Sequence, residues 1–343
     1  MLIALLVAIF LLSLYQVKFN LKGFHVDYLS KSKTDSVKGI FILLIVLTHS
    51  LQYILKSDYA FNGLGDSYYE SFLFHLGQLV VVMFLFYSGY GVSESFKKKG
   101  MPYVKAMPRH RLLTTLLNFD VAVIAFIAVD LLLGIAVTPG KCLLSLTGWQ
   151  SVGNSNWYIF VILLCYLMTF VVLRLSLSKR AHQAIVLFAI SFALVLLLYC
   201  FKDSYWYDTL LCYPLGFVYS AYKDPIESFL KRHYWVALSA VGALFVVTYL
   251  CPNDAMSLRF NLTSMLFALA VVMVTMKVGI GNAPLSWLGK NLFPIYIYMR
   301  VPMLVLEHEC PGMIASYPAL FIVTSLLVTL LIAKCYKYWQ IKL

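Results

Sequence analysis

Two ionisable residues share one face of a strongly apolar stretch near the start of the chain. Lys38 and His49 lie eleven residues apart within "VKGIFILLIVLTHSLQYILK", residues 37–56. Eleven residues make about three turns of an α-helix, so the two side chains share a face about 16 Å apart along its axis. Asp35 falls near the same stripe. A cation at one end and an imidazole deeper in the helix suit a long substrate with an anionic head and a reactive tail.

An ionisable group inside a membrane helix is costly and therefore predicts a functional site. Both residues also have a structural interpretation. Lys38 can extend to lipid phosphates, and His49 can hydrogen-bond to a neighbouring helix. The helical spacing of the pair favours the chemical interpretation.

A second polar stripe lies in the apolar stretch 72–93. Ser71, His75 and Gln78 are spaced at i, i+4 and i+7, so they share one helix face near its outer end. This pattern predicts the polar lining of a cavity. Hydrogen bonds between helices explain it equally well.

Two arginines near the start of one apolar stretch are suited to binding an anion. Arg109 and Arg111, in "RHR", begin an apolar stretch after a lysine-rich loop. Their guanidinium groups suit phosphates, although such a loop also binds anionic lipids. Arg300 lies deep in the stretch 286–306, one turn after Tyr296.

A buried arginine needs an anion or several acceptors. For Arg300 the candidates are Asp120, Asp130 or a bound substrate.

The elements that must position these residues are membrane helices. The 343 residues are 62% hydrophobic and 12% charged, whereas a soluble domain has roughly 25% charged residues. A spanning helix needs about 20 mostly apolar residues. Eleven stretches approach this length: 2–17, 37–56, 72–93, 112–137, 157–175, 183–201, 206–222, 234–251, 259–277, 286–306 and 315–335. The composition predicts an all-α, polytopic transmembrane bundle of about eleven helices.

Charge alternates between the connecting loops. One set is basic and the other holds mainly acidic residues. By the positive-inside rule, we expect the N-terminus outside and the C-terminus in the cytoplasm. The same rule accounts for the net charge of +12, so no nucleic-acid partner is expected. The seven cysteines are scattered without a CxxC pair, so neither a metal site nor a disulfide framework is expected.

Several motifs, taken in order, resemble the acyltransferase-3 family of bacterial membrane O-acyltransferases. "DSVKGIFILLIVLTHS" resembles its opening helix, in which a basic residue precedes the histidine by eleven positions. "FLFYSGYG", the "RHR" element, "NWYI", "LLCYPLG" and "LGKNLFPIYIYMRVPM" resemble its later motifs. The resemblance covers residues 32–335. It implies a ten-helix core, with 1–31 as an extra N-terminal helix and loop and 336–343 as a cytoplasmic tail.

The resemblance implies transfer of an acyl group, commonly acetyl, from acyl-CoA to a hydroxyl of a glycan or another envelope molecule. The setting would be a bacterial inner membrane and polysaccharide O-acetylation. His49 is then the expected general base. Lys38, Arg109 and Arg111 are expected to bind the donor. The expected substrate-binding residues are Asp35, His75, Gln78, Tyr90, Trp157, Tyr296 and Arg300.

Several points stay open at this level. The tautomer of His49 needs a partner, and Tyr53, Gln78 and Asp120 are candidates. Tyr296, Tyr298 or Arg300 would stabilise an oxyanion. Two other functions fit the same residues: a transporter or flippase for a polysaccharide or lipid-linked sugar, and a non-enzymatic membrane scaffold or sensor. The transporter predicts that His49 tolerates substitution and that no thiol is released from acyl-CoA. The scaffold predicts no tight CoA binding and buried polar groups that mainly hold helices together.

Overall fold

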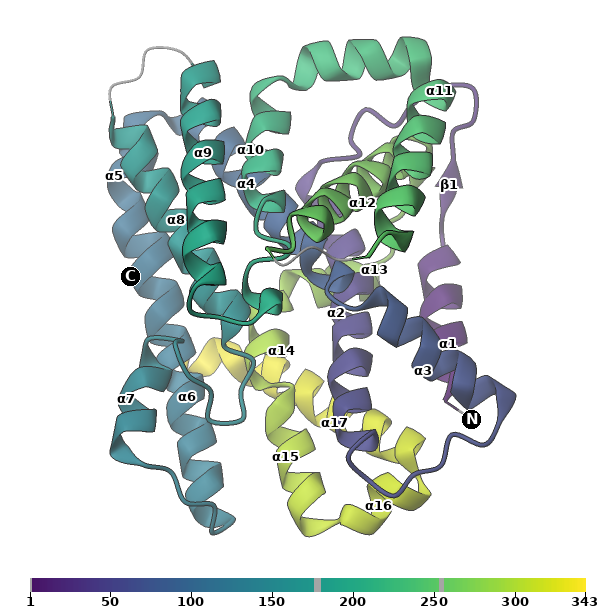
Figure 1. Ribbon diagram of the computed structural model, residues 1–343, viewed down its shortest axis with the longest axis vertical. Helices are drawn as coiled ribbons and strands as arrows, with labels where there is room; N and C mark the ends of the chain where they lie inside the picture. Colours follow the sequence, from purple (N-terminus) through teal and green to yellow (C-terminus); the bar gives the residue numbers. More distant parts are fainter. Residues whose placement is uncertain (1, 176–179, 253–255) are drawn as a thin grey trace.

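The structure, a computed structural model, describes residues 2–175, 180–252 and 256–343. It is almost entirely helical (Figure 1). One two-stranded antiparallel sheet pairs β1 (Lys18–Phe19) with β2 (Val278–Gly279). The longest helices are α2 (Lys31–Ile54), α4 (Leu79–Lys99), α6 (Thr114–Leu132), α8 (Trp157–Arg174), α9 (Arg180–Tyr199), α11 (Lys223–Leu250), α12 (Leu258–Lys277) and α17 (Pro318–Cys335).

Shorter helices connect or extend these. They are α1 (Ile3–Leu14), α3 (Leu64–Leu76), α5 (Met101–Met107), α7 (Pro139–Leu146), α10 (Cys212–Ala221), α13 (Ala283–Lys290), α14 (Leu292–Tyr298), α15 (Arg300–Glu309) and α16 (Pro311–Ser316). A π-helical turn, η1 (Pro108–Leu113), joins α5 to α6. Single 3-10 turns lie at η2 (Ser204–Trp206) and η3 (Tyr336–Tyr338).

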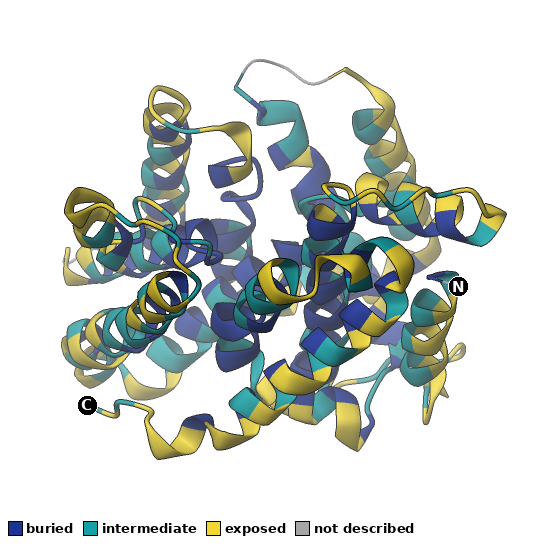
Figure 2. Cartoon of the chain, turned by 90° about the horizontal axis from the view of Figure 1, so that it is seen from below, coloured by how far each residue is buried: buried dark blue, intermediate teal, exposed yellow. Residues whose placement is uncertain are grey.

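The predicted all-α membrane fold is confirmed. Within the described ranges, eight helical stretches are long and apolar enough to cross a membrane. Their outer surfaces carry exposed large apolar side chains, such as Leu132 at 86% exposure and Val236 at 74%. Figure 2 shows buried residues gathered at the centre and exposed ones around the periphery. An apolar periphery of this kind suits contact with lipid.

Three of the eleven predicted stretches take another form. Residues 2–17 and 206–222 contribute only the short helices α1 and α10. Residues 286–306 are divided among α13, α14 and α15. Asn291 separates the first two, with φ −99° and ψ 20°. These breaks turn a straight segment into one that bends around the centre of the bundle.

The predicted stretch 72–93 is also interrupted. α3 ends at Leu76 and α4 begins at Leu79, because Gly77 adopts φ +44°. This left-handed backbone is easily reached only by glycine. The break separates His75 from Gln78, so the two side chains do not share one continuous helix face.

Two helix crossings depend on paired glycines. α2 crosses α13 at Gly39 and Gly289, and α4 crosses α10 at Gly89 and Gly216. At each of the four positions, a Cβ atom would overlap a backbone carbonyl oxygen of the other helix. Small residues let helix backbones approach closely in membranes. The crossings place α2, which carries Lys38 and His49, against the segment that leads to Tyr296 and Arg300.

We predict that Gly216→Ala destabilises the protein by about 1–3 kcal/mol, because the added methyl overlaps the Phe86 carbonyl. The measurement is the thermal unfolding midpoint in detergent. Gly242→Ala is the matched control, since no atom lies within 4 Å of its added Cβ in α11. Equal midpoints for the two variants would contradict the proposed role of the crossing.

Candidate active site

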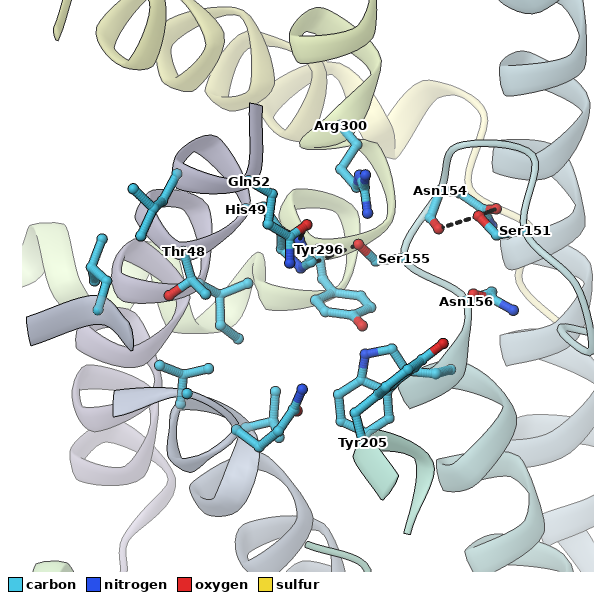
Figure 3. A pocket seen from close by; sticks show the side chains of 18 of the residues that line it. Thr48, His49, Gln52, Ser151, Asn154, Ser155, Asn156, Tyr205, Tyr296 and Arg300 are labelled. Carbon is cyan, nitrogen blue, oxygen red and sulfur yellow. Dashed lines mark hydrogen bonds between the residues drawn. The ribbon is translucent and has the colours of Figure 1, made fainter. Parts of the chain in front are cut away.

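His49 lies in a cavity of about 570 Å³ near the centre of the bundle, here called the His49 cavity (Figure 3). α2, the α3–α4 junction, the segment 151–157 and the helices α14 and α15 line its wall. Its polar and aromatic lining includes Thr48, His49, Gln52, Gln78, Ser151, Asn154, Ser155, Asn156, Trp157, Tyr205, Tyr296 and Arg300. The cavity therefore combines a base, hydroxyls, amides and a cation inside an apolar bundle.

The imidazole of His49 is held at both nitrogens. Nδ1 lies 3.3 Å from Oε1 of Gln52, and Nε2 lies 3.3 Å from Oγ of Ser155. Because an amide oxygen accepts hydrogen bonds, Nδ1 is the protonated nitrogen. Nε2 is then the basic nitrogen and accepts from the Ser155 hydroxyl. Gln52 thus sets the tautomer, a role for which the sequence suggested Tyr53, Gln78 or Asp120.

Ser155 reaches His49 on a segment folded by its own polar side chains. Oγ of Ser151 donates to the Asn154 carbonyl at 2.7 Å, and Oδ1 of Asn154 accepts from the Val152 amide at 3.1 Å. Nδ2 of Asn156 donates to the Gly148 carbonyl at 2.7 Å. These bonds hold Ser155, which is 4% exposed, beside a histidine 106 residues away in sequence.

The cavity wall presents donors that find no acceptor in the protein. Within the described residues, Nδ2 of Asn154 and the buried hydroxyl of Tyr296 form no hydrogen bond. Arg300 donates from Nε to the Tyr53 hydroxyl at 3.4 Å and stacks 5.5 Å from that ring. Buried donors usually have partners, so these groups point to a ligand with acceptor oxygens.

The expected carboxylate partner of Arg300 does not appear among the described residues. No ion pair there includes Arg300, and Asp120 and Asp130 form none either. Oδ1 of Asp120 is buried without a hydrogen bond. Among the described residues, the Tyr53 hydroxyl is the hydrogen-bond partner that Arg300 has instead.

A second cavity lies on the other side of Tyr296. This Arg111 cavity has a volume of about 400 Å³, and its polar lining includes Ser88, Arg111 and Lys290. Tyr296 lines both this cavity and the His49 cavity. Its ring packs edge-on against Tyr158, with centroids 5.3 Å apart. Aromatic rings therefore form the wall between the two cavities.

A third and larger cavity continues from the Arg111 cavity. This Lys38 cavity measures about 790 Å³ and shares Ser88 and Arg111 with its neighbour. Its lining is predominantly basic, with Lys31, Lys38, Lys98, Arg111 and Lys223 against Asp27 and Glu94. Lys38 itself forms a 2.6 Å ion pair with the buried Asp35. The excess of cations over carboxylates in the lining makes this cavity suitable for a polyanionic group.

The two arginines of "RHR" point in different directions. They lie in the π-helical turn η1, where Arg111 turns inward and stacks 5.7 Å from the Tyr166 ring. Arg109 is exposed and lines none of these cavities. Of the two arginines, the geometry therefore puts only Arg111 where a substrate in the bundle would contact it.

The structure gathers most of the residues that the sequence singled out. His49, Gln78, Trp157, Tyr296 and Arg300 line the His49 cavity, and Lys38, Tyr90 and Arg111 line the Lys38 cavity. His75 lies outside both; it is exposed, and its ring bonds back to the Ser71 carbonyl at 2.7 Å. The sequence reasoning missed Ser155 and Lys290. The polar run "NSN" before an apolar helix was the available signal for Ser155.

A fourth, more open cavity adjoins the His49 cavity. This Trp149 cavity, of about 560 Å³, shares Ser151, Asn156 and Tyr205 with it. The Lys202 ammonium lies 3.5 Å from the Trp149 ring centroid and 4.1 Å from that of Trp206. Burial between the rings lowers the pKa of Lys202, and the nearby Asp203 opposes this effect. Aromatic faces and polar groups thus extend the site.

The comparisons with known proteins identify the family of the chain. The chain matches the family model Acyl_transf_3, an acyltransferase domain, over residues 33–334. Neither a search of curated proteins nor a search of solved structures finds a match. The family match covers most of the chain and includes every lining residue of the His49 and Trp149 cavities. Lys31 of the Lys38 cavity and Tyr336 of the Arg111 cavity lie outside it. The chain therefore belongs to the acyltransferase-3 family and is a membrane acyltransferase.

Proposed function

We propose that this enzyme transfers an acyl group, acetyl in the first instance, from acyl-CoA to a hydroxyl of a cell-envelope glycan or lipid-linked sugar. The observation that carries the proposal is the position of His49. Its basic Nε2 faces a polar cavity, and a single aromatic wall separates that cavity from two cavities lined by cations.

The donor fits the two basic cavities. A nucleotide carries several phosphate charges, which the Lys38 cavity can neutralise. Arg111 lines both basic cavities, so it can contact the donor along its length. The rise from Lys38 to His49, about 16 Å along α2, suits an extended pantetheine arm. The thioester would then lie beside the Tyr158–Tyr296 wall.

The acceptor fits the opposite side of that wall. The Trp149 cavity offers tryptophan and tyrosine rings together with Gln150, Ser151 and Asn156. Aromatic rings stack on the apolar faces of sugars, and amide and hydroxyl groups bond to sugar hydroxyls. An acceptor hydroxyl that enters the His49 cavity gives its proton to Nε2 during acyl transfer.

We further propose that the basic cavities face the cytoplasm of a bacterial inner membrane, with the N-terminus outside and the C-terminus inside. The basic loops of the sequence support this orientation. It lets the donor enter from the cytosol while the acceptor enters from the outer side. CoA would not have to leave the cell.

The alternative function is a transporter for the same glycan, and the release of a thiol product distinguishes the enzyme from the transporter. Only the acyltransferase releases a free thiol from acyl-CoA. We expect His49→Ala to lower acyl transfer at least 100-fold, the lower range for loss of a general base. The measurements are thiol release and transfer of labelled acetyl to the envelope glycan fraction. The control is His75→Ala, which changes an exposed histidine outside the cavities; equal loss in both variants would count against the assignment.

We expect Arg111→Ala to raise KM for acyl-CoA by roughly tenfold or more, the effect of losing one charge-assisted hydrogen bond. Arg109→Ala should change KM by less than about twofold, because Arg109 is exposed and lines no cavity of the site. Initial rates at varied acyl-CoA concentration measure both values. A larger effect at Arg109 would refute the assignment of the donor site.

We expect Trp149→Ala to raise KM for the sugar acceptor by roughly two- to tenfold, because one stacking surface is lost. KM for acyl-CoA should stay unchanged, since Trp149 lines neither basic cavity. Trp235→Ala, at a tryptophan that is 60% exposed on α11, is the control. A change confined to KM for acyl-CoA would place the acceptor elsewhere.

A further inference from the structure

We propose that Ser155 is a catalytic nucleophile that carries the acyl group as an ester between donor and acceptor. This inference rests on the proposed function and adds a covalent intermediate to it. His49 then acts twice as a base, first on Ser155 and then on the acceptor hydroxyl.

The geometry is that of an activated serine. Oγ of Ser155 lies 3.3 Å from Nε2 of His49, and Nδ1 of the same ring lies 3.3 Å from Oε1 of Gln52. A nucleophile, a base and a group that orients the base thus follow one another. Gln52 orients the imidazole of His49 but carries no charge. Ser155 is 4% exposed, and its hydroxyl lies within hydrogen-bond reach of the imidazole.

The surrounding donors suit the oxyanion that such an attack generates. Nδ2 of Asn154 and the Tyr296 hydroxyl line the His49 cavity, and both are buried without hydrogen bonds in the described residues. Figure 3 shows the side chains of Tyr296 and Arg300 near His49 and Ser155. Donors already in place in a site without bulk water stabilise developing negative charge strongly.

The position of Ser155 also fits a relay. It lines the His49 cavity, one residue before Asn156 and three before Tyr158, whose ring packs on Tyr296 in the wall. An acyl group on Ser155 would remain in the His49 cavity after CoA leaves through the Arg111 cavity. Donor and acceptor would then never occupy the site together.

The two half-reactions balance. Oγ of Ser155 attacks the thioester carbonyl and its proton passes to Nε2 of His49; the carbon–sulfur bond breaks, and the thiolate takes that proton to leave as CoA thiol. The acceptor hydroxyl then attacks the Ser155 ester and gives its proton to Nε2. The carbon–Oγ bond breaks, and Oγ takes the proton back. The products are CoA and the acylated acceptor, with Ser155 and His49 restored.

The test uses the purified full-length protein with acetyl-CoA and radiolabelled CoA, without acceptor. A covalent intermediate predicts exchange of label into acetyl-CoA, together with an acetyl ester that peptide mass spectrometry finds on Ser155. Ser155→Ala should reduce exchange and overall transfer at least about 100-fold. Ser155→Cys should retain exchange and carry a trapped thioester.

Ser67→Ala is the control, because Ser67 is exposed on α3, donates to the Phe61 carbonyl and lines none of the four cavities; it should retain exchange. Thermal unfolding midpoints confirm that each variant is folded.

Transfer to glycan without exchange, or an acetyl group on His49 in place of Ser155, would overturn the covalent step and leave the proposed function intact. Exchange without transfer to any glycan would support the intermediate and overturn the acceptor. If the folded wild-type protein shows neither label exchange nor transfer to glycan, both proposals are overturned.

Discussion

The close crossing of α2 and α13 is the constraint on which the rest of the site depends. At Gly39 and Gly289 the two backbones approach so closely that no side chain fits between them. The crossing aligns the helix that carries His49 with the segment that continues to Tyr296 and Arg300. In a membrane, where lipid competes for apolar contacts, such close packing is a main source of helix association. The active site is thus built on a steric contact.

The crossing creates room for polar groups that the membrane would otherwise penalise. His49 is satisfied at both nitrogens, whereas Asn154 and Tyr296 keep unused donors within the described structure. An unpaired buried donor costs free energy. Under the proposed function, the same donors would acquire an acceptor when a carbonyl oxygen becomes negative between them. The free-energy cost of the unpaired donors and their proposed stabilisation of an oxyanion would therefore have one physical origin.

The wall formed by Tyr158 and Tyr296 divides a row of cavities into two chemically different halves. One half is lined by cations and the other by aromatic rings, amides and hydroxyls. Under the proposed function, this division would hold the charged donor in one half and the sugar acceptor in the other. The reacting groups would then meet at the wall.

The sequence by itself determined the membrane fold and the helix that carries Lys38 and His49. These follow from local composition, helical periodicity and the cost of burying charge, which act within one segment. The family resemblance of the sequence suggested Arg111, Trp157, Tyr296 and Arg300 as site residues. Only the tertiary structure decided that Ser155 and Gln52 hold His49, that Arg109 and His75 lie outside the cavities, and that residues 286–306 bend as three helices. Those outcomes depend on contacts between distant segments and on backbone breaks such as Gly77. No periodicity within a single segment encodes them.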